Sequence, residues 1–278
     1  MITIYLQGGL GNQLFQIFTC ISYAIKHNIE FKLPLYNQNQ KNSVSPTGAP
    51  RPTYWDSIFS TLTQYIVENN ELYNNKSMFK EKSFEYNEIP KISEDFILFG
   101  YYQSDKYFNN NFNKIYDLLN IKESKDKVKE KYKYLFDDNE TISMHFRLGD
   151  YKKLLHAHKI ISLKYYESCL KKIIKRNEKL FTVIYFCEDE DILEITDNIN
   201  YLKSNFKNLN FKRGKCNTDW EEMLLMSNCN HNIIANSSFS WWGAYLNNNK
   251  NKIVCRPKKW FVEKKELKDL CPNNWIVI

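Results

Sequence analysis

The sequence predicts an α/β fold built on parallel sheet, and three observations support this. Short β-branched and aromatic runs alternate with segments of helical period along the 278 residues. The composition, 43% hydrophobic and 26% charged, excludes collagen-like, coiled-coil and wholly disordered chains. Polar motifs stand where expected strands lead into helices, which is the edge of a parallel sheet where ligands bind. The length suggests one large domain or two medium ones; if there are two, we expect them at residues 1–138 and 139–278.

In the first half, residues 2–6 are β-branched and aromatic and predict the opening strand. A helix is expected over 14–25, because apolar side chains recur there every three or four residues. Residues 37–57 are rich in Asn, Ser, Pro and Gly and predict a long polar loop. The apolar run 96–99 predicts a second strand, and the charged segment 122–136 predicts an amphipathic helix that connects the two halves.

In the second half, apolar runs bounded by polar turns predict strands over 141–146, 182–186, 211–212, 232–235 and 253–256, the last strand of the chain. Apolar side chains at helical spacing predict helices over 163–180, 192–196, 220–227 and 239–246. Ser162 is the expected N-cap of the first of these helices. Strands and helices therefore alternate throughout, as in a parallel sheet.

Charge and cysteine content exclude several classes of protein. The net charge of +7 comes from 39 Lys and Arg against 32 Asp and Glu, and the basic residues are scattered. No helix-turn-helix, zinc-finger or RNP pattern is present, so no nucleic-acid partner is expected. The 7 Cys form no CxxC pair, which argues against a disulfide framework or a zinc site and for a reducing compartment. Because the first residues lack a signal-peptide pattern and no apolar window is long enough to span a bilayer, a cytoplasmic location is expected.

The first motif is the glycine-rich turn from Gly8 to Gln13, which holds Gly9, Gly11 and Asn12. Glycines allow backbone N–H groups to approach an anion or a sugar closely. The turn is neither a dinucleotide fingerprint nor a Walker loop, because the third glycine of GxGxxG and the GK[ST] element are absent. A tight turn without a ligand remains the alternative, and the amides of Asn12 and Gln13 favour a binding loop.

The second motif follows the strand expected over 141–146. His145 and Arg147 share one face of that strand, and the turn begins at Gly149. An arginine at the carboxyl end of a strand suits a bidentate grip on a diphosphate. Asp150 can orient Arg147, accept a proton or cap a helix. The alternative is a structural Arg–Asp pair beside a core histidine.

Two further segments have an anion-binding or metal-binding pattern. Residues 188–191 are all acidic and resemble a DxD metal motif, but we expect them to cap the following helix and expect no metal site. Residues 236–240 place hydroxyl groups at a helix start, where N–H groups bind anions. A serine-capped helix is the alternative there. GxSxG is absent, so no hydrolase is indicated.

Read together, these segments resemble the alpha-1,2-fucosyltransferase family and its relatives among the alpha-1,6- and protein O-fucosyltransferases. The resemblance rests on GGLGNQLFQ, GYYQSDKYF, HFRLGDY, CNHNIIANSSFSWWGAYL and RPKKWF, in this order. It implies a GT-B fold of two Rossmann-like lobes with the active site in the cleft between them, the first lobe on the acceptor side and the second binding the donor. It also implies GDP-fucose as donor, inversion at the anomeric carbon, and no metal or other cofactor.

The resemblance also implies roles for residues. Arg147 stands where the family grips the donor diphosphate, with His145 and Asp150 at the other motif positions. Asn12, beside Gly9 and Gly11, stands where related enzymes use an asparagine near the reacting centre. Leu148 replaces the second arginine that many members carry. The expected donor-binding segment at the second helix start comprises Asn236, Ser237, Ser238, Phe239 and Ser240.

The expected activity is therefore transfer of L-fucose from GDP-fucose to a galactoside hydroxyl, giving an alpha-1,2 linkage in glycan or surface polysaccharide synthesis. The expected partners are a nucleotide sugar and a galactose-terminated oligosaccharide, and Lys-rich patches would allow peripheral contact with an anionic inner membrane face. The alternatives are a transferase of another nucleotide sugar, such as a galactosyltransferase, and a non-catalytic glycan-binding module. The sequence leaves open the acceptor, the oligomeric state and whether His145 or Asp150 is the base.

Overall fold

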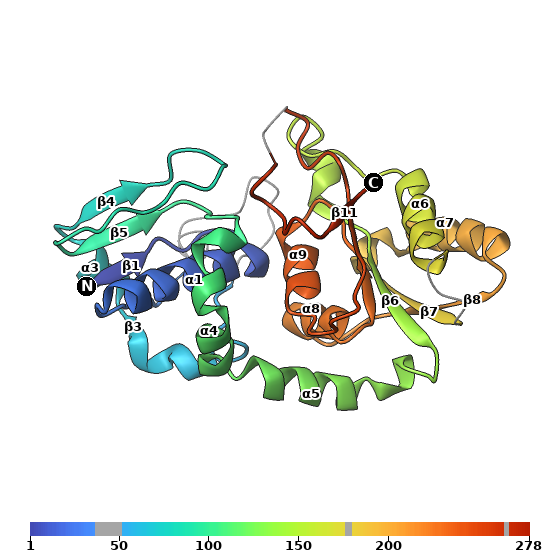
Figure 1. The fold of residues 1–278 in the computed structure, drawn as a ribbon, viewed down its shortest axis with the longest axis horizontal. Coiled ribbons are helices and arrows are strands. Elements are labelled where there is room, and N and C mark those ends of the chain that lie inside the picture. Colours follow the sequence, from blue (N-terminus) through green and yellow to red (C-terminus); the bar gives the residue numbers. More distant parts are fainter. Residues whose placement is uncertain (37–51, 176–179, 264–266) are drawn as a thin grey trace. The chain divides into compact units, whose positions relative to one another are not determined.

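The computed structural model describes residues 1–36, 52–175, 180–263 and 267–278 (Figure 1). The chain forms two compact units, unit 1 with Met1–Ser124 and Lys265–Pro272 and unit 2 with Lys125–Lys264 and Asn273–Ile278. The first crossing between units lies inside helix α5 (Ile121–Lys131), before the division expected at residue 138. Because a continuous helix carries the chain across, no linker-like composition marks this point.

Unit 1 is built on a parallel sheet in the order β1 (Ile2–Ile4), β5 (Phe96–Phe99), β4 (Ser77–Lys80). The strands expected over 2–6 and 96–99 are confirmed, and they pair directly, with Ile2 opposite Phe96. Strand β4 was not expected, because most of its side chains are exposed and it has no apolar run. The other short elements of this unit are β2 (Leu33–Pro34), β3 (Ile66–Val67), α3 (Asn69–Tyr73) and α4 (Phe112–Leu118).

Helix α1 (Leu10–His27) follows β1 and is almost entirely buried. It confirms the helix expected over 14–25 and extends it at both ends. Its apolar residues enter the core, and the polar side chains of Gln13 and Gln16 are also fully buried. A buried amide is costly unless it is hydrogen-bonded, so these two glutamines must hold specific partners at the helix start.

Unit 2 is built on a larger parallel sheet in the order β11-β10-β9-β6-β7-β8. Every pairing between strands of this sheet is parallel among the described residues. The strands are β6 (Glu140–His145), β7 (Phe181–Phe186), β8 (Leu209–Arg213), β9 (His231–Ile233), β10 (Val254–Arg256) and β11 (Ile276–Val277). The helices are α6 (Leu163–Ile174), α7 (Ile192–Asn205), α8 (Asp219–Ser227) and α9 (Ser238–Tyr245).

The five strands expected in the second half are all present, and β8 is an edge strand. The expectation that 253–256 is the last strand was wrong, because β11 adds to the sheet with Ile276 beside Cys255. A strand of two residues has no alternation that a sequence pattern can detect. The helix expected over 163–180 ends at Ile174, and Leu180 is 63% exposed and outside it. Ser162 is the N-cap of that helix but makes no side-chain cap bond.

Most of the polar loop expected over 37–57 lies outside the described residues. At its described end, Trp55 is buried and its indole N–H donates to the backbone oxygen of Leu35 over 2.8 Å. The 7 Cys are free and buried.

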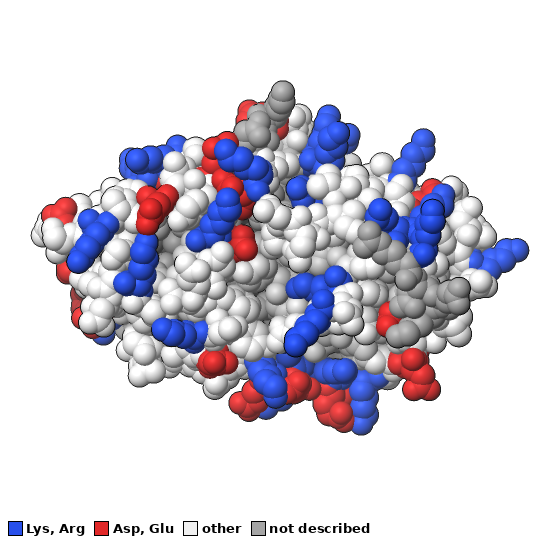
Figure 2. All heavy atoms as spheres, in the orientation of Figure 1, with Lys and Arg blue, Asp and Glu red and all other residues white. Residues whose placement is uncertain are grey.

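On the face drawn in Figure 2, basic side chains are scattered, and acidic side chains lie among them along α5. No helix in the described part of the chain is long and apolar enough to cross a membrane.

Candidate functional site

The carboxyl ends of β6, β7 and β9 lie at one edge of the unit 2 sheet, since these strands are parallel neighbours. Arg147 extends from the end of β6, and its two terminal nitrogens pair with the carboxylates of Asp150 and Glu188. The guanidinium carbon also lies 5.0 Å from the centre of the Tyr151 ring. The Arg147 side chain remains 21% exposed. A cation is therefore held in one orientation at the edge of the sheet.

Asp150 lies on the short helical turn η5 (Gly149–Lys153) and is 13% exposed. The sequence left three roles open for Asp150. Its contact with Arg147 corresponds to the first of them, orientation of the guanidinium. Gly149 begins the same turn with φ of 28°, and a Cβ there would lie 2.5 Å from a Glu188 carboxylate oxygen. Only glycine allows the turn and Glu188 to approach this closely.

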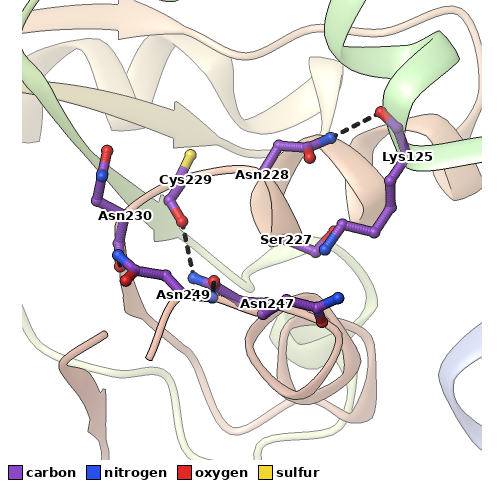
Figure 3. Close-up of a pocket in the computed structure, with 8 residues that line it drawn as sticks. Lys125, Ser227, Asn228, Cys229, Asn230, Asn247 and Asn249 are labelled. Carbon is purple, nitrogen blue, oxygen red and sulfur yellow. Dashed lines mark hydrogen bonds between the residues drawn. The ribbon is translucent and has the colours of Figure 1, made fainter. Parts of the chain in front are cut away.

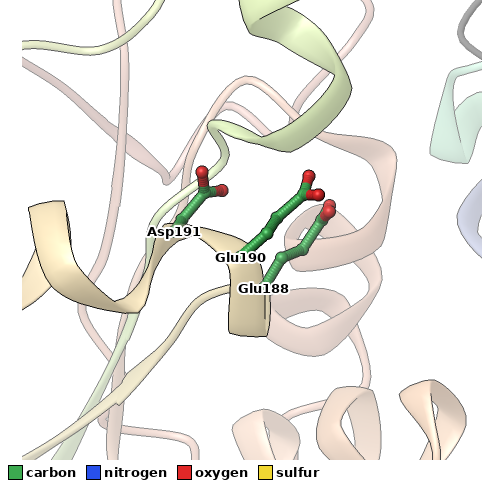
Figure 4. Close-up of side chains that lie close together, drawn as sticks. All are labelled: Glu188, Glu190 and Asp191. Carbon is green, nitrogen blue, oxygen red and sulfur yellow. The ribbon is translucent and has the colours of Figure 1, made fainter.

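The acidic segment after β7, whose side chains are drawn in Figure 4, contacts the same turn through Asp191. Glu188, Glu190 and Asp191 can each bring an oxygen within 4.8 Å of the others. Asp191 is buried and accepts the backbone N–H of Gly149 at 2.6 Å and the Lys152 ammonium at 2.7 Å. It stands at the N-cap of α7 but makes no side-chain cap bond there. The expected helix cap was therefore wrong for this side chain, which is directed to η5 because the cationic and N–H partners lie there.

Glu188 is the more accessible of the two carboxylates on Arg147, at 43% exposed against 13% for Asp150. Partial burial raises its pKa, and the charge of Arg147 opposes that effect. Glu188 is therefore the partner of Arg147 that is open to solvent.

His145 is the last residue of β6 and is 8% exposed. Its ring packs against Phe239, with centroids 5.6 Å apart, and its Nδ1 has no hydrogen-bond partner among the described residues. Burial, together with the charge of Arg147, lowers the pKa of His145 to about 3. The imidazole is neutral at physiological pH, and a group of such low pKa is a weak proton acceptor.

In the segment Asn236–Ser240, Asn236 and Ser237 lie between β9 and α9, and the three residues that follow form the first turn of α9 at the same edge. The Ser237 hydroxyl accepts from the Phe239 N–H at 3.3 Å, and the Ser240 hydroxyl accepts from the Ala235 N–H at 3.2 Å. The Asn236 amide is fully buried and donates to the backbone oxygens of Lys159 at 3.0 Å and Trp260 at 2.9 Å. These three side chains hold the turn itself, whereas Ser238 and Phe239 are partly exposed. Ser238 is thus the serine of this segment whose side chain is partly exposed.

Unit 1 has its own polar edge, at the carboxyl ends of β1, β5 and β4. Gly8 has φ of 79°, and a Cβ there would lie 2.5 Å from Asn12 Nδ2. Gly9 is the N-cap of α1, and Gly11 lies in its first turn. The Gln13 amide donates to the backbone oxygens of Gly8 at 3.1 Å and Pro52 at 2.8 Å, so it fixes the turn. Asn12 remains partly exposed and accepts a bond of 2.8 Å from the Gln103 amide.

The structure thus groups the expected site residues by unit. Unit 2 brings together His145, Arg147, Asp150 and the segment Asn236–Ser240, and unit 1 brings together Gly9, Gly11 and Asn12. The sequence reasoning missed several neighbours that the parallel sheet adds: Lys152, Glu188 as a partner of Arg147, Arg213 and Lys215. The last two pair with Asp189 at 2.5 and 2.7 Å. For Arg213 and Lys215, the sequence offered one signal: Gly214 stands between these two basic residues, directly after the strand expected over 211–212.

A hollow of about 270 Å³ lies at the opposite edge of the unit 2 sheet, before β9 and after α9 (Figure 3). Its walls are Lys125 and a group of asparagines, but their polar atoms already bind one another. The Asn247 amide donates to the Cys229 oxygen and to Asn232 Oδ1, both at 2.7 Å, and Lys125 donates to the Leu246 oxygen at 2.6 Å. These bonds close the end of α9, so this hollow belongs to the packing of the unit.

Comparison with known proteins identifies the family and the fold. Residues 55–278 match the model of glycosyl transferase family 11. The chain is 28% identical, over its whole length and 99% of the relative, to an alpha-1,2-colitosyltransferase of Escherichia coli. It is 32% identical to the O-antigen biosynthesis glycosyltransferase WbnK of Escherichia coli, over 67% of this chain and 62% of that protein. The E. coli ADP-heptose lipopolysaccharide heptosyltransferase II superposes with a TM-score of 0.52 at 10% identity, covering 100% of this chain and 89% of that one.

The expected fold class and family resemblance are confirmed: two α/β units with parallel sheets form a GT-B-type fold. The chain belongs to glycosyl transferase family 11.

Proposed function

We propose that this family 11 glycosyltransferase transfers L-fucose, or a closely related deoxy sugar, from a GDP-linked donor to a galactoside hydroxyl with inversion. The observation that carries the proposal is Arg147, held by Asp150 and Glu188 at the edge where α9 begins. The two relatives named for colitosyl transfer and O-antigen biosynthesis support a deoxy-sugar donor and a surface-polysaccharide acceptor. The finer assignment to an alpha-1,2 linkage rests on the motifs of the sequence.

Transfer of this kind requires a stabilised diphosphate leaving group. In the proposal, the donor diphosphate replaces the exposed carboxylate of Glu188 on the Arg147 guanidinium, while the more buried Asp150 keeps hold of the other nitrogen. The N–H groups at the start of α9 and the positive end of its dipole add to the same field. Groups already oriented toward the developing charge stabilise the transition state without reorganisation.

The proton of the attacking hydroxyl needs an acceptor, and neither residue considered from the sequence suits this role. His145 has its pKa lowered to about 3 by burial and by Arg147, and Asp150 is paired with Arg147. We therefore assign Asp150 to orientation of Arg147 and His145 to packing against Phe239. The proton would leave late, after the bond to the diphosphate has largely broken, and it would go to water, because with inversion the acceptor hydroxyl attacks the face opposite the leaving group.

The acceptor sugar offers hydroxyl groups, which pair well with neutral amides. Asn12 in unit 1 is such an amide, next to Gly8 and Gly9 at the start of α1. We propose that Asn12 hydrogen-bonds a substrate oxygen and so helps to align the reacting groups, an effect that lowers the activation barrier through orientation.

A donor and acceptor panel tests the proposal. GDP, UDP, ADP, GDP-fucose and a colitosyl donor would be compared by thermal shift, since a ligand that binds only the folded state raises its stability. Transfer to galactosides would be read by mass spectrometry, with the linkage determined on the product. We expect stabilisation by GDP and by a GDP-deoxy sugar and a mass increase of one sugar. Stabilisation by UDP alone, or transfer only from a UDP-sugar, would contradict the proposed donor class and favour the galactosyltransferase alternative.

A further inference from the structure

Glu81 follows β4 and lies at the carboxyl edge of the unit 1 sheet. Its two carboxylate oxygens accept the backbone N–H groups of Tyr101 at 2.8 Å and Tyr102 at 3.0 Å. The side chain packs over Gly100, where any Cβ would clash with it. Glu81 thus closes the turn that follows β5, although it comes from a neighbouring strand 20 residues earlier.

The turn held by Glu81 is strained. Tyr102 has φ of 51°, in the left-handed region that a bulky residue adopts only at a cost of about 1 kcal/mol. The two bonds from Glu81 and a bond of 3.2 Å from the Tyr102 hydroxyl to the Phe79 oxygen maintain this conformation. Because surrounding contacts hold the backbone of Tyr102 in this conformation, they also fix the direction in which the chain continues to Gln103.

From this turn the Gln103 side chain extends to Asn12, which is 91 residues away in the sequence. Its amide Nε2 donates a hydrogen bond to Asn12 Oδ1 at 2.8 Å. Because the carbonyl of Asn12 is occupied, the group that Asn12 can offer is its NH₂. That nitrogen has no hydrogen-bond partner within residues 1–36, 52–175, 180–263 and 267–278, and the Asn12 side chain is partly exposed. The Asn12 amide is therefore fixed with its donor side available.

The Gln103–Asn12 bond is not needed to hold α1 against the turn. Gln16, fully buried on α1, already does so, because its amide donates to the Gly100 oxygen at 3.1 Å and its carbonyl accepts the Gln7 N–H at 3.1 Å. The same helix thus contacts the same turn through one buried glutamine and one partly exposed amide pair. The second contact orients a side chain that is only partly buried.

We propose that Glu81 and Gln103 are positioning residues that fix the Asn12 amide so that it donates a hydrogen bond to an oxygen of a bound sugar. Glu81 holds the turn through two backbone N–H groups, Gln103 extends from the turn and hydrogen-bonds Asn12, and Asn12 contacts the substrate. The inference rests on the proposed function for the identity of the ligand as a sugar. The hydrogen-bonded chain itself is independent of that function and can be tested without it.

The kinetic test uses Gln103→Ala, Gln103→Glu and Asn12→Asp, with the exposed Gln64→Ala as matched control. Loss of the Gln103 donor frees the Asn12 amide to rotate, so we expect transfer kcat/KM for the acceptor to fall about tenfold, with Tm and GDP affinity unchanged. Asn12→Asp keeps an acceptor for Gln103 but removes the NH₂ group, and we expect it to lose at least as much. Unchanged acceptor kinetics in both Gln103 variants would overturn the proposal.

Glu81 is tested by a graded pair, Glu81→Gln and Glu81→Ala, with the exposed Glu94→Gln as control for the loss of charge. A glutamine retains one acceptor oxygen for the two N–H groups, so we expect a smaller loss of activity than for alanine. The double variant of Glu81→Gln with Gln103→Ala should lose no more activity than Gln103→Ala alone, because both act on Asn12. Additive losses would show that Glu81 acts by another route and would overturn the chain.

A spectroscopic readout separates failure of this inference from failure of the proposed function. Relative to the wild type, the side-chain NH₂ resonances of Asn12 should shift in Gln103→Ala and in Glu81→Gln. The backbone amide hydrogens of Tyr101 and Tyr102 should exchange with solvent faster in Glu81→Ala. If no donor and acceptor pair supports transfer, the proposed function fails while these shifts still test the chain. Unchanged Asn12 resonances in both variants would overturn the positioning role whatever the activity.

Discussion

The polar edges of the two units differ in charge. The unit 2 edge carries ionised groups in opposing pairs, with Arg147 on Asp150 and Glu188 and with Lys152 on Asp191. The unit 1 edge carries neutral amides, from Asn12, Gln13, Gln16 and Gln103, and the carboxylate of Glu81 there accepts two backbone N–H groups.

The difference indicates which kind of ligand each edge suits. An edge with a preoriented guanidinium and a helix start stabilises a dianionic leaving group. An edge of amides recognises hydroxyl groups through hydrogen bonds between neutral groups. Two sheets of the same parallel architecture thus supply different chemistry through the residues placed after each strand, in keeping with the rule that function depends on the site and not on the fold.

The largest expected effect is on the charged edge. Arg147→Ala should lower transfer kcat/KM by about 10²–10³, since removal of one preorganised donor to a developing anion costs that much. Arg147→Lys keeps the charge but not the bidentate geometry, and we expect it to recover only part of the loss. Steady-state transfer and GDP affinity are the measurements, with the exposed Lys164→Ala as control. Near-normal turnover with unchanged GDP affinity in Arg147→Ala would contradict the diphosphate role.

The second effect is on the amide edge. Gly8→Ala places a Cβ 2.5 Å from Asn12 Nδ2 on a backbone of φ 79°, and we expect a loss of about 2–3 kcal/mol in the free energy of unfolding. Gly9→Ala is the matched control, because Gly9 has φ of −80° and extended ψ, which alanine adopts without strain. Urea denaturation gives both values. Equal stability of the two variants would show that the turn does not depend on the left-handed glycine.

The third effect is a pH dependence of stability in unit 2, caused by Glu222 in α8. Burial raises the pKa of Glu222 from 4.5 to about 7. Between these two values the unfolded chain has lost this proton while the folded chain keeps it, so folding is progressively disfavoured as pH rises from 4.5 to 7. Because glutamine does not titrate, we expect the loss of folding free energy between pH 4.5 and 7 to be smaller in Glu222→Gln by about 1–2 kcal/mol. Denaturation at pH 4.5 and pH 7.5 measures it, and parallel curves for the two proteins would contradict the shift.

The smallest expected effect is that of metal removal. Asp191, the buried member of the acidic cluster, is paired with Lys152, so we propose that the donor sugar is the only small molecule the charged edge requires. EDTA should change the transfer rate by less than about twofold. If EDTA abolished activity and added Mn²⁺ or Mg²⁺ restored it, the acidic cluster would be a metal site, and this part of the comparison would be overturned.

Residues near one another in sequence were predicted well. The strand before Arg147, the turn at Gly149 and the helix start at Ser237 follow from short apolar runs that end in polar or glycine residues. The partners of these residues were not predictable, because Glu188 is 41 residues from Arg147 and Gln103 is 91 residues from Asn12. Such pairs depend on which strands are neighbours in the sheet, and one sequence does not encode strand order in any local pattern.

The role of Asn236 shows the same limit. The sequence placed it correctly at the start of α9, but its amide binds the backbone of Lys159 and Trp260 and is fully buried. Its side chain therefore holds two loops together. The segment containing Trp260 follows β10, the strand beside β9, so only the folded sheet brings it to Asn236.

The sequence by itself determined the fold class, the family and the positions of Arg147, Asp150 and Asn12 after their strands, because these depend on local periodicity and on motifs of adjacent residues. The tertiary structure decided which carboxylate is available for exchange with an anion, which asparagines are structural, and how Glu81 and Gln103 fix Asn12. These properties depend on burial and on contacts between strands distant in sequence, and both arise only when the parallel sheets have formed.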